Sequence, residues 1–564
     1  MSYSTHPLKQ KRRRVSHKVA PLMAIATAAT CALAACSSSS STHDTASQSG
    51  QGHSLLTSTP PAKGSVANLT WDLPLGEPTS LDYVKSGTPP QNVLVANMCD
   101  TLRRVTPNLT FAPNLATSYK YSADHLTLTY AIREGVKFWD GTALTAADVA
   151  YSLNRNMNPA DAPVNGYVYS NVASINATGR YTVVVKFQQP DEMFNSEMAG
   201  APGEIAEKAY IQKKGQAYGT VAGGVMCSGP YKLAEWNAGQ DIVLAANTSY
   251  WNKTLIPYAK TVTLQFITDT GTLVQALKSG AIDGAYGIPA TVIQALQGNG
   301  AGKLYFGESP QLDVFLPNDT PAGNDENIRK ALSMVLDRSA LAAKIYNGAA
   351  EPAYSILPKP LWDKRALPTY KTIDQQLNLP TTPNLTAAKA LIKGDPIAKQ
   401  PITINTEAGD QLLGNVLALL QQEAQSIGLN VQIKVQQPLQ FNNAFYESTA
   451  RKGIDFIFDQ TYTYVPDPLD YLTDNVYEGG ALTYIKSPNG AKATAYFAQA
   501  RRTVGDAQRA VLTGKALKFA TAGQLVIPIV TRDLTLYMNK RITGAIPTWG
   551  YFGYPSFAVI GSSS

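Results

Sequence analysis

The segment REGVKFWDGTALTAADVAYSL, residues 133–153, carries two aspartates, an arginine, a tryptophan and two threonines within one short span. Two carboxylates at such a spacing could act as a general acid and a general base. Their neighbours favour a structural role instead. Asp140 precedes Gly141 in a turn dipeptide, and Thr145 and Asp148 have the spacing of a capping box at the start of a helix. We therefore predict a strand, a turn and a helix here, and no catalytic residue.

Histidine is scarce in the part of the chain that is expected to fold. The five histidines are His6, His17, His43, His53 and His125. Only His125 lies in the predicted folded body, so a Ser–His–acid or Cys–His arrangement would have to use it. The chain has no GxSxG or GxxxxGK[ST] motif, and one histidine is too few for a zinc site. We expect no catalytic residue, metal or cofactor, while a carboxylate pair of the glycosidase kind remains open.

The N-terminus has the pattern of an export signal. A basic segment without acids is followed by VAPLMAIATAATCALAA, 17 uncharged residues that end at Cys36. This run is shorter than the ~20 apolar residues of a membrane span. Leu33-Ala34-Ala35-Cys36 resembles a bacterial lipobox, so we expect a lipoprotein signal peptide over residues 1–35 and lipidation of Cys36. An ordinary signal cleaved after ALA, and twin-arginine export, remain alternatives.

Removing the signal changes how the charge and the linker are interpreted. Without its six basic residues the formal net charge falls from +7 to about +1, which gives no reason to expect nucleic-acid binding. Residues 36–65 are rich in Ser, Gly, Thr and Pro, and this composition predicts a flexible tether. We expect an exported protein, anchored by lipid to the outer face of the bacterial cytoplasmic membrane.

Two cysteines remain in the body once Cys31 leaves with the signal and Cys36 is lipidated. These are Cys99 and Cys227. Outside the cytoplasm two remaining thiols most often pair, which favours a disulfide between them. Two separate buried thiols are the alternative.

The body alternates between strand and helix patterns. ITINT (402–406), a helical pattern over 412–428 and NVQIKVQQ (430–437) form a βαβ unit, and RYTVVVKFQQP (180–190) alternates as a strand. The tail LVIPIVTRDLTLYMNKRITG, residues 525–544, returns to strands. This alternation predicts an α/β protein with a sheet that helices cover on both faces.

Six segments, in this order, carry a resemblance to a known family. They are FAPNLATSYKYSADHLTLTYAIREGVKFWDGTALTAADVAYSLNR, SGPYKLAEWNAGQDIVLAANTSYW, ENIRKALSMVLDRSALAAKIYNGAAEPAYSILP, QSIGLNVQIKV, GIDFIFDQTYTYVPDP and QLVIPIV. Together they resemble the bacterial family 5 extracellular solute-binding proteins, the receptors of dipeptide, oligopeptide and nickel ABC importers. The resemblance spans about residues 66–555.

This resemblance implies a two-lobed periplasmic-binding-protein-like fold of type II, in the large peptide-binding class. Lobe I would comprise residues 66–308, with an inserted subdomain at about 97–225, and the C-terminal return 533–564. Lobe II would comprise residues 309–532. The ligand would be enclosed between the lobes, which close over it about a hinge.

The resemblance also implies where a ligand would bind. Peptide-binding relatives use the loop after the first strand and the segment before an Asp-Pro, and the matching candidates here are Leu75, Gly76, Glu77, Tyr462, Tyr464 and Asp467. Tyr286 is a further candidate for a ligand contact. In those relatives an aspartate four residues before the proline pairs with the peptide's ammonium, and Tyr464 occupies that position. Asp467 is either a substitute for this aspartate or a turn residue. Tyr462 and Tyr464 would offer rings to an apolar or sugar-like ligand, unless one of them packs against the sheet.

The function that follows is a lipid-anchored monomer that captures peptides or a peptide-like solute for an ABC importer. Its partners would be permease and ATPase subunits encoded elsewhere. A sugar or oligosaccharide receptor of the same family is the leading alternative. A secreted carboxylate-pair hydrolase, and a receptor that signals without import, are alternatives of other classes.

Overall fold

The computed structural model describes residues 52–298 and 300–564. The predicted signal peptide, Cys36 and most of the tether lie outside this range. No helix within the described range has both the length and the apolar character that crossing a membrane requires.

The last residues of the predicted tether are paired with the rest of the chain, which corrects the expectation of a flexible linker up to residue 65. Leu55 bridges to Phe306 and Gly64 to Ser562, while Thr59 is 3% exposed and donates its backbone N–H to Ala545 O at 3.0 Å. Backbone groups supply these bonds, so a polar, glycine-rich composition does not prevent them.

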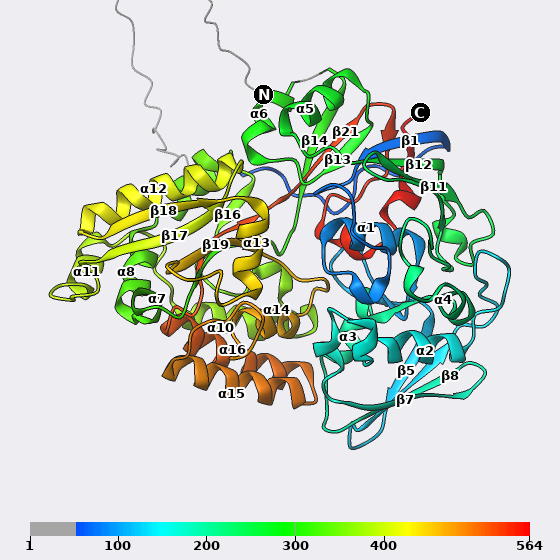
Figure 1. Cartoon of the computed structure of the whole chain (residues 1–564), viewed down its shortest axis with the longest axis horizontal. Coiled ribbons are helices and arrows are strands. Elements are labelled where there is room, and N and C mark those ends of the chain that lie inside the picture. The colour runs from blue at the N-terminus through cyan, green and yellow to red at the C-terminus, as the bar shows by residue number, and fades with distance from the viewer. Residues whose placement is uncertain (1–51, 299) are drawn as a thin grey trace, which may run out of the picture. The chain divides into compact units, whose positions relative to one another are not determined.

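The first of two large sheets has seven strands in the order β10-β11-β12-β1-β13-β21-β14 (Figure 1). β1 is parallel to both β12 and β13, and the other neighbours are antiparallel. The strands are β1 (Val66–Asp72), β10 (Tyr231–Asn237), β11 (Asp241–Ala246), β12 (Ala259–Gln265), β13 (Gly284–Tyr286), β14 (Gly302–Gly307) and β21 (Leu534–Asn539).

The second large sheet has six strands in the order β16-β20-β15-β19-β17-β18. The predicted βαβ unit is confirmed, because β17 and β18 are parallel and α12 connects them. The strands are β15 (Leu312–Pro317), β16 (Ala350–Pro352), β17 (Pro401–Glu407), β18 (Asn430–Gln436), β19 (Phe456–Thr461) and β20 (Ile527–Arg532).

The chain passes between the two sheets at two places. It leaves the first sheet after β14 and enters the second at β15, and it returns between β20 and β21. The first crossing lies between Gly307 and Leu312, and the second between Arg532 and Leu534. We use lobe I for residues 52–308 and 533–564, and lobe II for residues 309–532.

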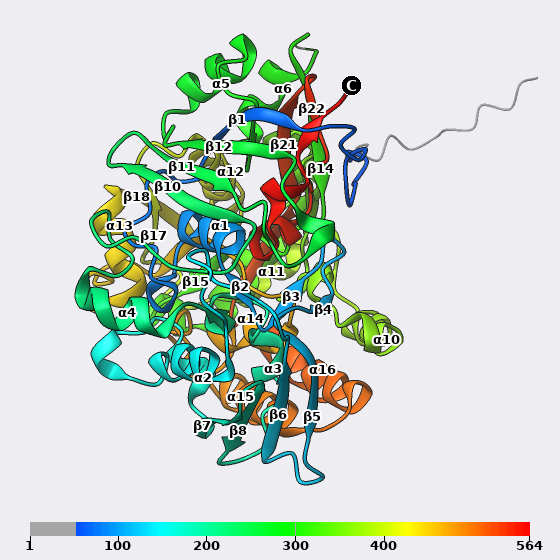
Figure 2. The ribbon, with the colours of Figure 1, turned by 90° about the vertical axis from the view of Figure 1, so that its right-hand side faces the viewer.

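Lobe I also contains a four-stranded antiparallel sheet, in the order β5-β6-β8-β7, within the predicted insertion (Figure 2). Its strands are β5 (Ala116–Tyr121), β6 (Thr127–Ile132), β7 (Val172–Gly179) and β8 (Thr182–Phe187). Short strand pairs elsewhere in lobe I are β2 (Asp100–Thr101) with β9 (Glu204–Ile205), β3 (Arg103–Val105) with β4 (Phe111–Pro113), and β22 (Ile542–Thr543) with β23 (Gly561–Ser562).

Helices cover the sheets of each lobe. Those of lobe I are α1 (Pro89–Met98), α2 (Ala146–Arg155), α3 (Phe194–Glu197), α4 (Lys208–Lys214), α5 (Thr270–Ser279) and α6 (Ile293–Leu296). Those of lobe II are α7 (Pro321–Asn324), α8 (Glu326–Val335), α9 (Arg338–Ala340), α10 (Leu367–Leu377), α11 (Leu385–Leu391), α12 (Gln411–Ile427), α13 (Pro438–Tyr446), α14 (Pro468–Asn475), α15 (Pro488–Arg502) and α16 (Asp506–Ala522). In the six-stranded sheet, Phe315 and Phe458 belong to one core while Val314 and Ile457 belong to another. Both faces of this sheet are therefore buried, as predicted.

The predicted turn and helix within 133–153 are confirmed, but the predicted strand before the turn is wrong, because only a single bridge joins Lys137 to Ala143. Asp140 accepts hydrogen bonds from Thr142 N at 2.9 Å and Thr142 Oγ1 at 2.7 Å, and Gly141 has φ 94°. Thr145 caps α2, and its backbone N–H donates to Asp148 Oδ2 at 3.0 Å. These carboxylates hold a turn and a helix start.

Candidate functional site

The segment between β19 and α14 reaches from lobe II onto lobe I. Tyr462 and Tyr464 are half-buried and lie on the same side of the extended chain, as side chains two residues apart do. The Tyr462 ring lies 5.6 Å from that of Trp549, and the Tyr464 ring stacks on Phe552 at 6.2 Å and 26°. The Tyr464 hydroxyl donates to Gly87 O at 3.1 Å. In this structure both tyrosines are contacts between the lobes.

Thr463 holds the opposite side of this segment in place. Its carbonyl oxygen accepts a hydrogen bond from Trp549 Nε1 at 3.0 Å, and its hydroxyl donates to Asp470. Thr463 is 3% exposed. The segment is thus bound on both sides, and Trp549 of the C-terminal return is its partner in lobe I.

Asp467 has the local role that the sequence left as one of two alternatives. It is the N-cap of α14 and accepts a hydrogen bond from Leu469 N at 2.8 Å. The carboxyl is buried, and burial raises its pKa although the nearby Arg509 opposes the shift. A buried capping carboxylate is poorly placed to take the ammonium group of a ligand.

A small cavity lies beside Tyr464 and Phe552. Its volume is about 20 Å³, and its polar lining includes Asn92, Asp100 and Arg104 of lobe I. One water needs about 10–15 Å³ measured in this way, so the cavity matches one or two waters and not a peptide. A peptide could enter between the lobes only if they moved apart.

The loop after β1 lies at the surface of lobe I. Leu75 is 76% exposed, and both Leu75 and Gly76 have positive φ, 64° and 83°. The Glu77 carboxylate accepts hydrogen bonds from Trp236 Nε1 at 2.8 Å and Gly239 N at 2.9 Å. The structure therefore ties Glu77 to the β10–β11 hairpin and leaves the Leu75 side chain accessible.

Tyr286 differs from its predicted role as a ligand contact. It is 2% exposed and lies in the core of lobe I, stacked on Tyr551 at 4.0 Å and 5.4 Å from Trp71. β13 is a central strand of the seven-stranded sheet, so both its faces are covered. Tyr286 is a packing residue in this structure.

Sequence reasoning missed a pair of carboxyl groups that meet between the lobes. Glu197 ends α3 of lobe I, Asp470 lies in α14 of lobe II, and they are 0% and 3% exposed. The two groups affect each other electrostatically, and the charge of Asp470 raises the pKa of Glu197. Retaining glycosidases separate their carboxyl groups by ~5 Å so that a sugar fits between them. This buried pair leaves no room for a substrate and gives no support to a hydrolase.

His125 is held between Glu192 and Tyr121 in lobe I. Its Nδ1 lies 2.7 Å from Glu192 Oε1, and its ring stacks on Tyr121 at 4.8 Å. Within residues 52–298 and 300–564, no group of three or more His, Cys, Asp or Glu side chains is arranged to hold a metal ion.

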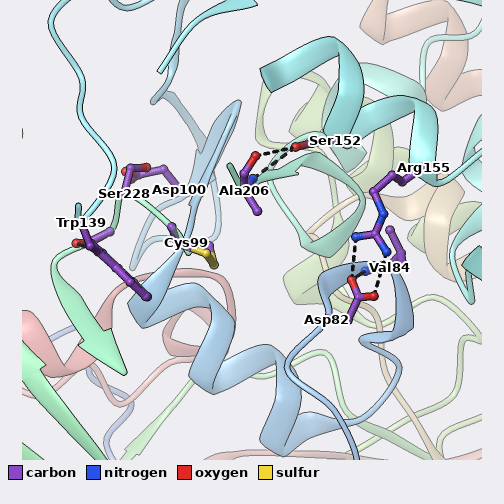
Figure 3. Close-up of a disulfide and its surroundings, with 11 residues drawn as sticks. Asp82, Val84, Cys99, Asp100, Trp139, Ser152, Arg155, Ala206 and Ser228 are labelled. Carbon is purple, nitrogen blue, oxygen red and sulfur yellow. Dashed lines mark hydrogen bonds and ion pairs between the residues drawn. A yellow bond between two sulfur atoms is a disulfide. The ribbon is translucent and has the colours of Figure 1, made fainter. Parts of the chain in front are cut away.

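Cys99 and Cys227 form a disulfide in the core of lobe I, which is the pairing that the cysteine count favours (Figure 3). Next to it, the buried Asp100 carboxylate accepts four hydrogen bonds. The donors are Tyr250 Oη at 2.7 Å, Ser228 Oγ at 2.8 Å, Trp251 Nε1 at 2.9 Å and Asn114 Nδ2 at 3.3 Å. This network joins the end of α1 to the segments around β10 and β11.

Comparison with known proteins identifies relatives of the whole body. A family model described as bacterial extracellular solute-binding proteins, family 5, matches residues 110–482. The glutathione-binding protein GsiB of Escherichia coli O1:K1 / APEC is 31% identical over 245 residues, which are 43% of this chain and 47% of that protein. The chain thus matches about half the length of this relative.

Other relatives match over more of the chain. The periplasmic oligopeptide-binding protein OppA of Escherichia coli K12 is 26% identical over 78% of this chain and 82% of its own length. Among solved structures, AppA of Bacillus subtilis, in complex with a nonapeptide, superposes with a TM-score of 0.73 and 19% identity over 90% of this chain and 100% of AppA. The family resemblance and the two-lobed α/β fold that it implies are confirmed.

Proposed function

The chain belongs to the bacterial extracellular solute-binding proteins, family 5, and we propose that it captures a peptide or a peptide-like solute between its lobes for an ABC importer. OppA is named as a binder of oligopeptides and GsiB as a binder of glutathione. Both are peptide-class ligands, which supports the same class here. The solute would be passed to permease and ATPase subunits that are separate chains.

The observation that carries this proposal is the way the chain joins the lobes. Two crossings connect the sheets, after β14 and after β20, and the contact segment before α14 faces the C-terminal return of lobe I. Two bodies joined by a pair of short connections can close on a ligand as a hinge. Leu75 and Glu77, whose carboxylate is hydrogen-bonded to the β10–β11 hairpin, would contact the ligand from lobe I. Tyr462 and Tyr464 would leave Trp549 and Phe552 and contact the ligand instead.

We also propose that the protein is exported, held at the outer face of the cytoplasmic membrane by lipid on Cys36, and works as a monomer. The support is the LAAC sequence behind an uncharged run and a basic segment. Radiolabelled palmitate should be incorporated into the wild-type protein and not into Cys36→Ala. Equal labelling of both proteins would contradict lipidation at this residue.

A sugar receptor is a second candidate, because a specific position favours it. Tyr464 stands where peptide-binding relatives have an acid, and Asp467 is occupied as a helix cap. Without an accessible carboxylate there, the two tyrosine rings would suit a sugar face or an apolar ligand better than a free ammonium.

Native mass spectrometry of the full chain, purified from its own host without denaturant, tests the proposal. Adducts that fragment as peptides are the expected result. Adducts that fit sugars would overturn the peptide class and support the second candidate. In a separate incubation, an identified ligand is added back to the protein. If this ligand is converted to products over a long time, the protein is a hydrolase and not a receptor.

A further inference from the structure

The carboxyl pair between the lobes is unusual because Glu197 has no hydrogen-bond donor among the described residues. Neither oxygen of the Glu197 side chain has a hydrogen-bond partner among the described residues when Glu197 is a carboxylate. Asp470 accepts from the Tyr167 hydroxyl at 3.0 Å and from the Thr463 hydroxyl. Two carboxylates have no proton to share, so the contact between these groups is a hydrogen bond only when one of them is protonated.

The surroundings do not supply a positive charge to replace this proton. Arg501 of α15 is the cation whose charge acts on Glu197, and it opposes the rise in the pKa of that carboxyl. Its Nε and Nη2 are both bound to Asp191, with a shortest contact of 2.6 Å. The other ionisable groups that face the pair are acids and phenols, namely Asp191, Asp467, Asp474, Tyr167, Tyr169 and Tyr464. Burial, and then the neighbouring acids, raise the pKa of both Glu197 and Asp470 far above their ordinary values.

The pair also lies in a contact that joins the lobes. Glu192 donates its backbone N–H to Arg501 O at 2.9 Å, and Thr473 Oγ1 lies 3.7 Å from Met193 Sδ. Figures 1 and 2 both place α3 beside α14 and α15. A change in charge at the pair therefore acts on the contact between lobe I and lobe II.

We propose that Glu197 and Asp470 form a proton-dependent latch, which holds the lobes together when the pair carries one shared proton and weakens when that proton is lost. The step is one proton leaving a carboxyl group to solvent, and it leaves two buried carboxylates in contact. Their repulsion and their need for water favour separation of the lobes. With the proposed function as its premise, the latch makes the receptor retain its solute best in acid and release it faster as the pH rises.

Small-angle X-ray scattering of the dialysed, ligand-free chain tests the latch without any knowledge of the ligand. Between about pH 4.5 and about pH 8.5 the radius of gyration of the wild-type protein should increase as the lobes separate. Glu197→Gln should lose this increase, because the amide N–H donates to Asp470 at every pH. Asp470→Asn supplies a donor from the other side and should behave in the same way.

Glu423→Gln is the matched control. Glu423 lies in α12 of lobe II, and burial raises its pKa to about 7, but its side chain accepts a hydrogen bond from Asp337 N within the same lobe. This variant should keep the wild-type change in radius. A wild-type radius that is constant with pH, or a Glu197→Gln profile equal to that of wild type, would overturn the latch. Because no ligand is present, neither result depends on whether the solute is a peptide.

Discussion

Asp100 and Asp470 are equally buried, at 3% exposure each, but their surroundings differ in one respect. Asp100 lies in the core of lobe I, and each of its two carboxylate oxygens accepts two hydrogen bonds. Asp470, between the lobes, has two hydroxyl donors and a second carboxyl group, that of Glu197. Burial alone therefore does not decide how a carboxyl behaves.

The difference separates two regions. We call the surroundings of Asp100 the fixed region, and the surroundings of the Glu197–Asp470 pair respond to pH in our proposal. Four donors satisfy the oxygens of Asp100. The Glu197–Asp470 contact needs one proton to be a hydrogen bond at all. The fully hydrogen-bonded carboxylate thus lies inside lobe I, and the proposed pH-sensitive contact lies between the two lobes.

The largest expected effect is on the fixed region. Replacing Cys99 and Cys227 by Ala should lower the free energy of unfolding by about 4 kcal/mol, since the disulfide closes a loop that spans 128 residues. Urea denaturation measures this loss. Reductant should destabilise the wild-type protein by a similar amount and leave the double variant unchanged; equal effects on both would contradict the assignment.

A smaller loss should follow from Asp100→Asn. The amide replaces one acceptor oxygen by a donor, so that either Trp251 Nε1 or Asn114 Nδ2 loses its acceptor. We expect a loss of about 3 kcal/mol. Urea denaturation measures this loss, and an unchanged stability would show that these hydrogen bonds contribute nothing.

Glu197→Gln should have the opposite sign and a marked pH dependence. Because the folded-state pKa values of the pair are raised, its contribution to stability is fully present below the unfolded values of 4.5 and 3.8 and is lost as the pH rises. The variant should match wild type near pH 4 and exceed its stability by about 2 kcal/mol near pH 8. Thermal melts across this range measure the difference, and parallel curves would refute it.

The smallest expected effect concerns Tyr464. Tyr464→Phe keeps the ring on Phe552 and removes only the hydrogen bond to Gly87 O, so it should cost about 1 kcal/mol. The half-exposed Tyr119 is a control, and Tyr119→Phe should change stability by less than about 0.5 kcal/mol. Equal melting temperatures for Tyr464→Phe and wild type would show that the Gly87 contact contributes nothing.

Much of the fold was accessible from the sequence because its signals are local. The Asp140–Gly141 turn and the Thr145–Asp148 cap depend on residues within four positions of each other. The βαβ unit around α12 follows from periodicity alone. The site was less accessible: Tyr462 and Tyr464 were proposed from the Asp-Pro nearby, and Tyr286 was proposed as a ligand contact although the central position of β13 buries it.

The sequence by itself therefore determined the family and the alternation of strands and helices, and it favoured the pairing of Cys99 with Cys227 that the structure shows. Only the tertiary structure decided that Tyr464 contacts Gly87 and Phe552, and that Glu197 meets Asp470. The physical reason is that turns and caps are hydrogen bonds between near neighbours in the chain. Burial of a carboxyl, in contrast, depends on which distant elements pack against it, and a pattern along one chain does not carry that information.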